Sequence, residues 1–197
     1  TEFSDAEGSK ANYSQIRSWI VLLVDCNISN RTINRKLSSL NSYYKFLLKT
    51  DSIKLNPLAK HKALKVSRKI QIPFSEVEIS NVLENIPTDT FEGLRDKLII
   101  ELFYSTGMRR IELVQLHLQD VDLSQGQVKV LGKRNKERFT PLIPSVIHTF
   151  QAYISERSKL ETIKDNAVLF LTKKGTKVYE MLVYRVIVNY FDTISSK

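Results

Sequence analysis

The residues of this sequence that are best suited to binding an anion lie in the string TGMRRIEL, residues 106–113. Thr106-Gly107 favours a turn that leads into a helix, and Arg109 is followed three residues later by Glu112. Residues three apart on a helix share a face, so we expect Glu112 to hold the guanidinium of Arg109 in one orientation, as a preorganised anion site requires. Arg110 points to another side of the helix, and we expect it to be structural.

A basic hairpin follows this helix in the sequence. Residues 127–130 favour a strand, the run GKRNKE at 132–137 favours a turn, and residues 138–142 favour the returning strand. Lys133 would then lie near the tip of the hairpin. The hairpin carries three further bases, Arg134, Lys136 and Arg138, which we expect to contact a polyanion.

Three stretches of the sequence resemble a known family. The TGMRRIEL string, the Asp120-Val121-Asp122 segment and the GKRNKERFTPL hairpin are similar to the first half of the catalytic domain of tyrosine recombinases, most closely the Xer-type bacterial site-specific recombinases. By this resemblance Arg109 corresponds to the first catalytic arginine and Lys133 to the hairpin lysine, while the helical spacing gives Glu112 the supporting role. The match is specific because two separated motifs occur in the right order.

The resemblance implies site-specific DNA recombination through a 3′-phosphotyrosyl intermediate, with no metal or nucleotide cofactor. Arg109 would place positive charge on the nonbridging oxygens of a scissile phosphate, because its guanidinium never loses its charge. Lys133 would give a proton to the departing 5′-oxygen. The structural alternatives are a plain salt bridge for Arg109 and an ordinary turn lysine for Lys133.

A second informative element is a helix predicted from Ser29 or Asn30 to about Lys49. One face is apolar, and the opposite face carries Arg31, Arg35, Ser38, Ser42, Lys45 and Lys49. Such a helix can lie along the major groove of DNA with its bases on phosphates, whereas the alternative is a solvated, lysine-rich face. In Xer-like recombinases a helical core-binding domain occupies this position, and its usual first helix is absent or incomplete here.

The charge distribution favours a nucleic-acid partner. The formal charge is +9. Residues 11–73 carry 12 bases and 2 acids, residues 74–126 carry 4 bases and 10 acids, and residues 127–197 carry 13 bases and 6 acids. Two basic regions flanking an acidic one suit a clamp on double-stranded DNA better than a uniform solubilising charge does. The lone Cys26 and the absence of a signal peptide favour the cytoplasm, and three scattered histidines make a metal site unexpected.

We expect a mainly α protein with a small antiparallel β-hairpin or sheet. Residues 1–58 would form an incomplete, helical SAM-like core-binding domain, 59–73 a basic linker, and 74–197 a C-terminally truncated α+β catalytic domain. Helices are predicted at 12–25, from the Ser75–Glu78 capping box onward, at 91–105, 143–157 and 179–191, with Arg95 and Asp96 at the surface and a buried strand at 168–171.

The second half of the family's active site has no counterpart in the sequence. None of His61, His117 and His148 begins a His-x-x-Arg box, and we assign no tyrosine as the nucleophile. We therefore expect a fragment that binds DNA weakly, does not cleave it and is monomeric alone, whereas the complete chain would form a tetramer of like or unlike recombinase subunits on DNA.

Two further interpretations stay open. One is a noncatalytic DNA-binding regulator that keeps the integrase fold, and the other is a basic helical protein-interaction module without salt-dependent DNA binding. For a recombinase, resolution of chromosome dimers during partition and integration of a transposon or other mobile element fit the motifs equally well.

Overall fold

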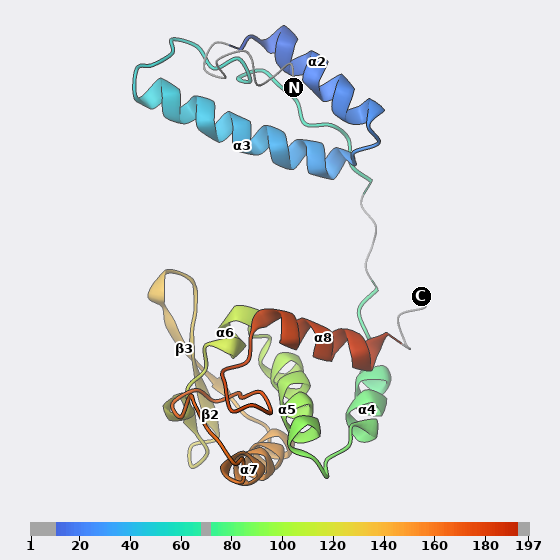
Figure 1. Cartoon of the computed structure of the whole chain (residues 1–197), viewed down its shortest axis with the longest axis vertical. Helices are drawn as coiled ribbons and strands as arrows, with labels where there is room; N and C mark the ends of the chain where they lie inside the picture. Colours follow the sequence, from blue (N-terminus) through green and yellow to red (C-terminus); the bar gives the residue numbers. More distant parts are fainter. Residues whose placement is uncertain (1–10, 68–71, 193–197) are drawn as a thin grey trace. The chain divides into compact units, whose positions relative to one another are not determined.

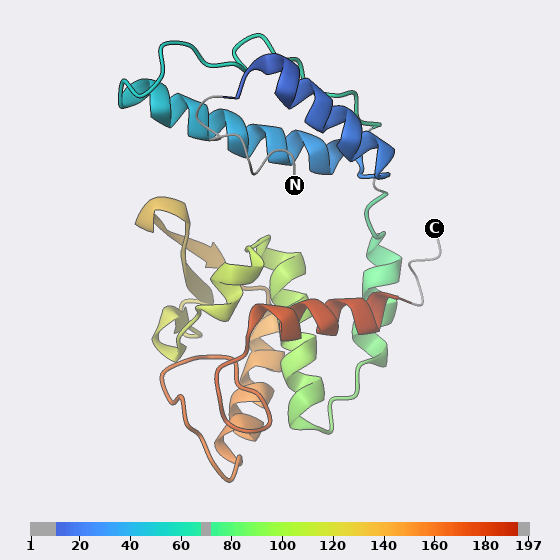
Figure 2. The ribbon, with the colours of Figure 1, turned by 45° about the horizontal axis from the view of Figure 1, so that its top comes forward.

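A computed structural model describes residues 11–67 and 72–192 of the chain. The chain divides into two compact units, residues 1–72 and 73–197 (Figures 1 and 2). The predicted domain limits at residues 58 and 74 stay a prediction. Residues 68–71 of the predicted linker, the first ten residues and the last five lie outside the described residues.

The described residues of the first unit contain the two helices that we predicted. They are α2 (Tyr13–Asp25) and α3 (Asn30–Lys49). The side chain of Asn12 caps the first, in a capping box with Gln15, and the Ser29 side chain caps the second. The apolar stripes of the two helices meet in one core, made of Ile16, Ile20 and Leu23 from α2 and Ile33, Leu37, Tyr44 and Leu47 from α3.

The segment that follows α3 is attached to that helix by asparagine side chains. Asn34 donates to the carbonyl of Leu64 and accepts from its N–H, both at 2.9 Å, while Asn30 donates to the Lys65 carbonyl at 2.8 Å. Leu58 and Leu64 pack on the same core. The stretch from Leu58 to Lys65 is therefore held against the helices of the first unit.

The second unit is mainly helical with a small antiparallel sheet, which confirms the predicted fold class. Its elements are α4 (Glu76–Asn85), α5 (Phe91–Thr106), α6 (Arg110–Val114), η2 (Leu118–Asp120), β1 (Val121–Asp122), β2 (Gln127–Leu131), η3 (Lys133–Asn135), β3 (Glu137–Pro141), α7 (Pro144–Ser158) and α8 (Glu180–Phe191). The strand order is β1-β2-β3, and in the hairpin Val128 pairs with Thr140 and Val130 with Arg138.

Helix α5 is the centre of this unit, and it contacts α4, α7 and α8. Because these neighbours surround it, Arg95 and Asp96 are buried, and their predicted exposure is wrong. The pair is satisfied internally: an Arg95 nitrogen lies 2.7 Å from Asp96 Oδ1, and another donates to the Leu171 carbonyl. Desolvation is the main cause of a raised pKa of Asp96, and the Arg95 charge opposes it.

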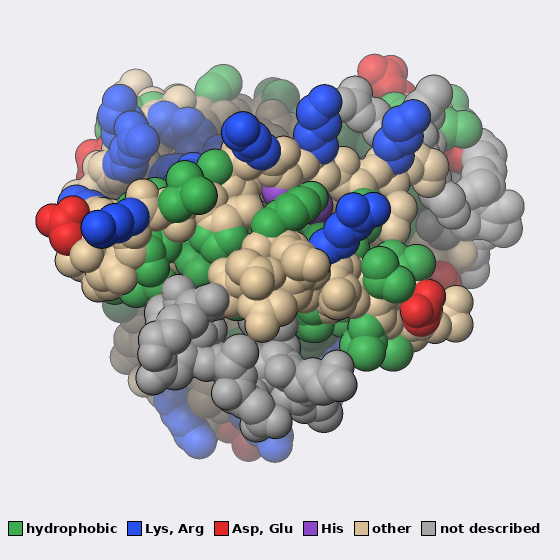
Figure 3. All heavy atoms as spheres, turned by 90° about the horizontal axis from the view of Figure 1, so that it is seen from above, with side chains coloured by type: hydrophobic (Ala, Val, Ile, Leu, Met, Phe, Trp, Pro, Cys, Tyr) green, Lys and Arg blue, Asp and Glu red, His purple; other side chains and the backbone are tan. Residues whose placement is uncertain are grey.

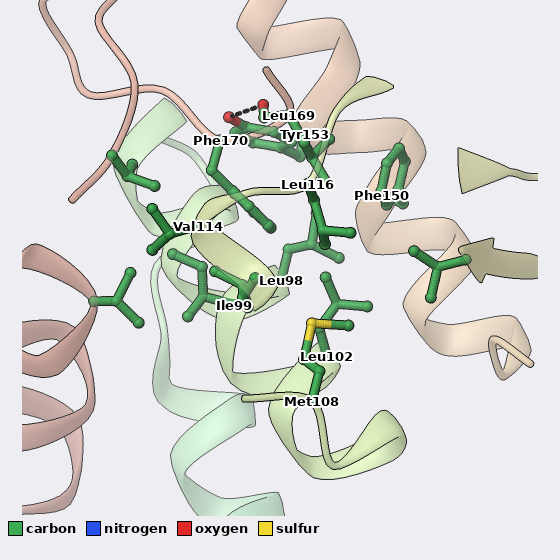
Figure 4. Packing of buried hydrophobic residues seen from close by; sticks show 14 of the residues in the cluster. Leu98, Ile99, Leu102, Met108, Val114, Leu116, Phe150, Tyr153, Leu169 and Phe170 are labelled. Carbon is green, nitrogen blue, oxygen red and sulfur yellow. Dashed lines mark hydrogen bonds between the residues drawn. The ribbon is translucent and has the colours of Figure 1, made fainter. Parts of the chain in front are cut away.

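Residues 168–171 are buried as predicted, although they do not form a strand of the sheet. They make isolated bridges, Val168 to His117 and Leu171 to Lys177. Two side chains of α7 hold this segment instead. The fully buried Tyr153 hydroxyl donates to the Leu169 carbonyl at 3.1 Å (Figure 4). It also accepts from the Leu171 N–H at 3.1 Å, and Arg157 donates to three carbonyls between residues 165 and 168.

Within the described ranges, no helix combines the length and the apolar character needed to cross a membrane.

Replacing the Tyr153 hydroxyl tests how much this attachment stabilises the second unit. Tyr153→Phe leaves the buried N–H of Leu171 without its acceptor, so we expect the free energy of unfolding to fall by about 1–3 kcal/mol. Urea denaturation followed by the methyl NMR signal of the buried Met108 measures the change. The exposed Tyr184 provides the control, since Tyr184→Phe should stay within about 0.5 kcal/mol of the wild type. Equal effects of the two substitutions would contradict this assignment.

Candidate functional site

Arg109 stands at the junction between the central helix and a short one. Helix α5 ends at Gly107, whose φ of 60° lies in the left-handed region that favours glycine, and α6 begins at Arg110. Arg109 has an extended backbone (φ −78°, ψ 152°) and is the residue before the first helical one. The shared helical face that we predicted for Arg109 and Glu112 implies that Arg109 lies within the helix, but it precedes the first helical residue by one position.

The predicted contact between Arg109 and Glu112 is present. Arg109 Nη1 donates to Glu112 Oε1 at 2.7 Å, and the Arg109 backbone N–H donates to Glu112 Oε2 at 2.9 Å. The two side chains differ sharply in exposure, 67% for Arg109 and 3% for Glu112. A buried carboxylate thus orients a guanidinium whose other N–H groups face solvent, which is the arrangement an anion site needs.

A second arginine shares the same carboxylate. Arg138, on β3, donates from Nη2 to Glu112 Oε2 at 2.8 Å, and its side chain is 39% exposed. We expected Arg138 to contact DNA, and the sequence reasoning did not foresee this ion pair. The strand register contains the signal: Arg138 lies directly opposite the buried Val130, and opposite residues of an antiparallel pair share a face.

The hairpin loop begins against this cluster, defined here as the Glu112 clamp: Arg109, Glu112 and Arg138. A Cβ built on Gly132 would lie 3.3 Å from Arg138 Nη1 and 3.6 Å from Glu112 Oε1. Lys133 is the next residue, with its Cα about 3.8 Å further along the chain, and it is exposed in the turn η3. Arg109 is thus part of the Glu112 clamp, and the backbone of Lys133 lies next to it.

The remaining predicted residues of the hairpin are exposed. Arg134 has a φ of 63° in the turn. Lys136 lies two residues further on, and its carbonyl accepts a 2.8 Å hydrogen bond from the Gly132 N–H. Arg110 is turned away from the Glu112 clamp, as predicted: its Nε lies 3.0 Å from Glu180 Oε2. This pair ties α6 to the start of α8, and Figures 1 and 2 show α6 between α8 and the hairpin.

In the first unit, the predicted basic stripe of α3 is exposed along its whole length. Its members are Arg31, Arg35, Ser38, Ser42, Lys45 and Lys49. The Ser42 hydroxyl donates to the Ser38 carbonyl at 3.0 Å, so its oxygen stays available as an acceptor. The following segment adds the exposed Lys54, Lys60, Lys62 and Lys65. Figure 3 shows Lys and Arg side chains spread over one face, with acidic side chains only at its margins.

The pKa of Glu112 reports how strongly the fold favours its charged form. The hydrogen bond from Arg138 is the largest cause of a fall from the ordinary 4.5 to about 2, and the backbone and side-chain bonds from Arg109 add to it against the opposing effect of burial. A pKa lowered by folding stabilises the protein above the unfolded value, and this stabilisation disappears as the pH falls toward 2. The difference corresponds to about 3 kcal/mol at neutral pH.

In the described part of the chain, no group of three or more His, Cys, Asp or Glu side chains is arranged to hold a metal ion.

Glu112→Gln is therefore expected to lower the free energy of unfolding of the second unit by about 3 kcal/mol at pH 7. The difference from the wild type should shrink below pH 4.5 and vanish near pH 2, where Glu112 itself becomes protonated. Urea denaturation at a series of pH values, read by the Met108 methyl signal, measures it. Glu137→Gln removes an exposed carboxylate from the same hairpin and should have little effect. A pH-independent loss in Glu112→Gln would show that charge is not the cause.

Comparison with known proteins covers both units. Residues 57–192 match the model of the phage integrase family, and residues 5–51 match the model of the phage integrase N-terminal SAM-like domain. Tyrosine recombinase XerC of Staphylococcus haemolyticus is 34% identical over 168 residues, which are 85% of this chain and 56% of that protein. Tyrosine recombinase XerC of Natranaerobius thermophilus is 33% identical over 201 residues, 100% of this chain and 67% of that protein. The chain thus spans little more than half of the first relative and two thirds of the second.

Solved structures share the fold. The XerH site-specific recombinase bound to palindromic difH substrate aligns with a TM-score of 0.77 and 20% identity, over 100% of this chain and 60% of that one. The Tn1549 transposon integrase in complex with transposon right end DNA aligns with a TM-score of 0.73 and 19% identity, over 95% of this chain and 67% of that one. The matched family models, the curated relatives and the common fold agree, and the chain belongs to the phage integrase family, as a tyrosine recombinase of the Xer type.

Proposed function

We propose that this chain supplies the DNA-binding surface and the first two catalytic groups of a site-specific DNA recombinase. The relatives that carry the name tyrosine recombinase XerC support this proposal, although the chain spans only 56% and 58% of the first two of them. The observation that carries it is the Glu112 clamp, which presents the exposed Arg109 guanidinium beside the start of the Lys133 loop.

The proposed reaction is an exchange of phosphodiester bonds. A tyrosine oxygen attacks the phosphorus of a DNA phosphodiester, a 3′-phosphotyrosyl bond forms, and the bond to the 5′-oxygen breaks. The N–H groups of Arg109 that Glu112 leaves free donate to the nonbridging oxygens, where negative charge builds up in the transition state. Lys133 gives a proton to the departing 5′-oxygen, and the 5′-hydroxyl so formed later attacks the partner strand. We assign the nucleophile to none of Tyr179, Tyr184 and Tyr190, which lie on or next to α8.

Double-stranded DNA is the proposed partner of both units. The bases of the α3 stripe and Arg134 and Lys136 of the hairpin would bind backbone phosphates, which position the protein without reading sequence. Ser38 and Ser42 are short enough to let α3 approach base edges in the major groove. We propose that the complete protein works in the cytoplasm, as a tetramer of like or unlike recombinase subunits, in chromosome dimer resolution or in the movement of a genetic element.

The salt dependence of DNA binding tests the α3 stripe. Arg35→Gln should weaken binding of the chain to a duplex and lower the slope of log K against log salt by about 1, because one phosphate contact is lost. Lys36→Gln is the matched control: the adjacent residue is also an exposed base of α3, but it lies off the stripe. Fluorescence anisotropy at several salt concentrations measures both variants. Equal slopes for Arg35→Gln and Lys36→Gln would exclude the stripe as the contact surface.

Covalent capture tests the proposed chemistry in the complete polypeptide that contains these residues. With a nicked duplex that loses its short 5′-hydroxyl strand on cleavage, the wild type should accumulate a covalent adduct, and Arg109→Ala should form it about 100-fold more slowly. Lys133→Ala should be slowed on the same substrate. A substrate with sulfur in place of the bridging 5′-oxygen should restore Lys133→Ala, because a thiolate leaves without a proton, but it should not restore Arg109→Ala.

The outcomes separate the alternatives. DNA binding without any wild-type adduct would favour a noncatalytic DNA-binding regulator with the same fold, and no salt-dependent binding at all would favour a protein-interaction module. We expect the 197-residue chain by itself to bind the duplex and to form no adduct, since its sequence contains no His-x-x-Arg box.

A further inference from the structure

Both oxygens of the Glu112 carboxylate are occupied by groups from two different parts of the second unit. Oε1 accepts from Arg109, which precedes α6, and Oε2 accepts from Arg138 on β3 and from the Arg109 backbone. Because Glu112 is buried, the loss of either arginine would remove a hydrogen-bond donor from the carboxylate that water cannot readily replace. The carboxylate is therefore a fixed link between the turn that carries Arg109 and the hairpin that carries Lys133.

The hairpin loop is packed against this link at its first residue. Gly132 leaves space that a Cβ would fill at 3.3 Å from Arg138 Nη1 and from the Lys136 carbonyl. The Gly132 N–H donates to that same carbonyl at 2.8 Å and closes the loop. The Arg138 guanidinium thus lies beside both the buried carboxylate and the backbone from which Lys133 extends.

We propose that Arg138 is a positioning residue: by binding Glu112 it holds the Lys133 loop in register with Arg109, and it does not itself bind a DNA phosphate. This inference rests on the proposed function for the catalytic roles of Arg109 and Lys133. It replaces the expectation that Arg138 contacts DNA in the manner of Arg134 and Lys136.

Charge and exposure both support this role. Both arginines bind the Glu112 carboxylate, at 2.7 and 2.8 Å, but the Arg138 side chain is 39% exposed against 67% for Arg109, so less of it is available to a phosphate. One glutamate between two arginines leaves the clamp with a net charge of +1. Without Arg138 the Arg109–Glu112 pair would be neutral, and Arg109 would attract an anion less strongly.

The link can be tested in the 197-residue chain without any DNA. In Arg138→Gln, the Glu112 carboxyl should titrate by NMR well above the wild-type pKa of about 2, and amide exchange of Gly132 should speed up at least tenfold. Arg138→Lys keeps the positive charge but loses the planar guanidinium. Its Glu112 pKa and its Gly132 exchange rate should therefore lie between those of the wild type and Arg138→Gln. Arg134→Gln, an exposed base of the same loop, should change neither quantity. The Met108 methyl signal reports whether each variant is folded.

Two further measurements separate positioning from phosphate binding. In DNA binding, Arg134→Gln should lower the salt slope by about 1, whereas Arg138→Gln should lower it by less than half as much. In the complete polypeptide, Arg138→Gln should slow adduct formation at least tenfold. The 5′-thio substrate should recover most of that loss, because a misplaced Lys133 is then no longer needed.

The proposal is overturned if Arg138→Gln leaves both the Glu112 titration and the Gly132 exchange unchanged, or if it lowers the salt slope as much as Arg134→Gln does. Failure of the proposed function looks different. A wild-type chain that neither binds DNA nor forms an adduct would refute the recombinase assignment, while the NMR titration and the exchange rates would still decide whether Arg138 holds the loop.

Discussion

The buried carboxylate of Glu112 is the interaction on which the arrangement of the second unit's basic residues depends. A charge at 3% exposure costs a large desolvation free energy unless its oxygens accept hydrogen bonds, and here three N–H donors from Arg109 and Arg138 bind both of them. These donors belong to two segments, the turn before α6 and strand β3. The requirement to satisfy one carboxylate therefore sets the positions of a turn and a hairpin together.

This clamp works only because α6 is itself held in place. A helix of five residues has no stability of its own, since so short a segment does not repay the cost of nucleation. Leu113 and Val114 are buried in the core around α5, and Arg110 pairs with Glu180 at the start of α8. The anion site is thus held in place through α6 by the central helix α5, which its neighbours cover on nearly all sides. The predicted phosphate contacts Arg134 and Lys136, in contrast, lie on an exposed loop.

Local rules predicted the features that local sequence controls. Capping residues and apolar periodicity placed the helices to within a residue or two, and the spacing of Arg109 and Glu112 predicted their contact. Tertiary contacts were missed. Arg95 and Asp96 were assigned to the surface because an amphipathic helix was assumed to have one open face, and the ion pair of Arg138 was not foreseen because its partner lies 26 residues away. The one sequence feature that indicated this pair was the hairpin register, which places Arg138 opposite the inward-facing Val130.

The same pairs change the meaning of the charge pattern. Residues 74–126 carry ten acids and four bases, which suggests that the region around Arg109 repels an anion. In the fold, however, Glu112 is paired with Arg138, Asp120 lies 3.8 Å from Lys129, and Asp96 is enclosed with Arg95. Two of these bases come from the following, basic segment. The field at the site is therefore set by which charges the fold pairs and buries, and Arg109 remains the most exposed charge of a clamp that is positive by one unit.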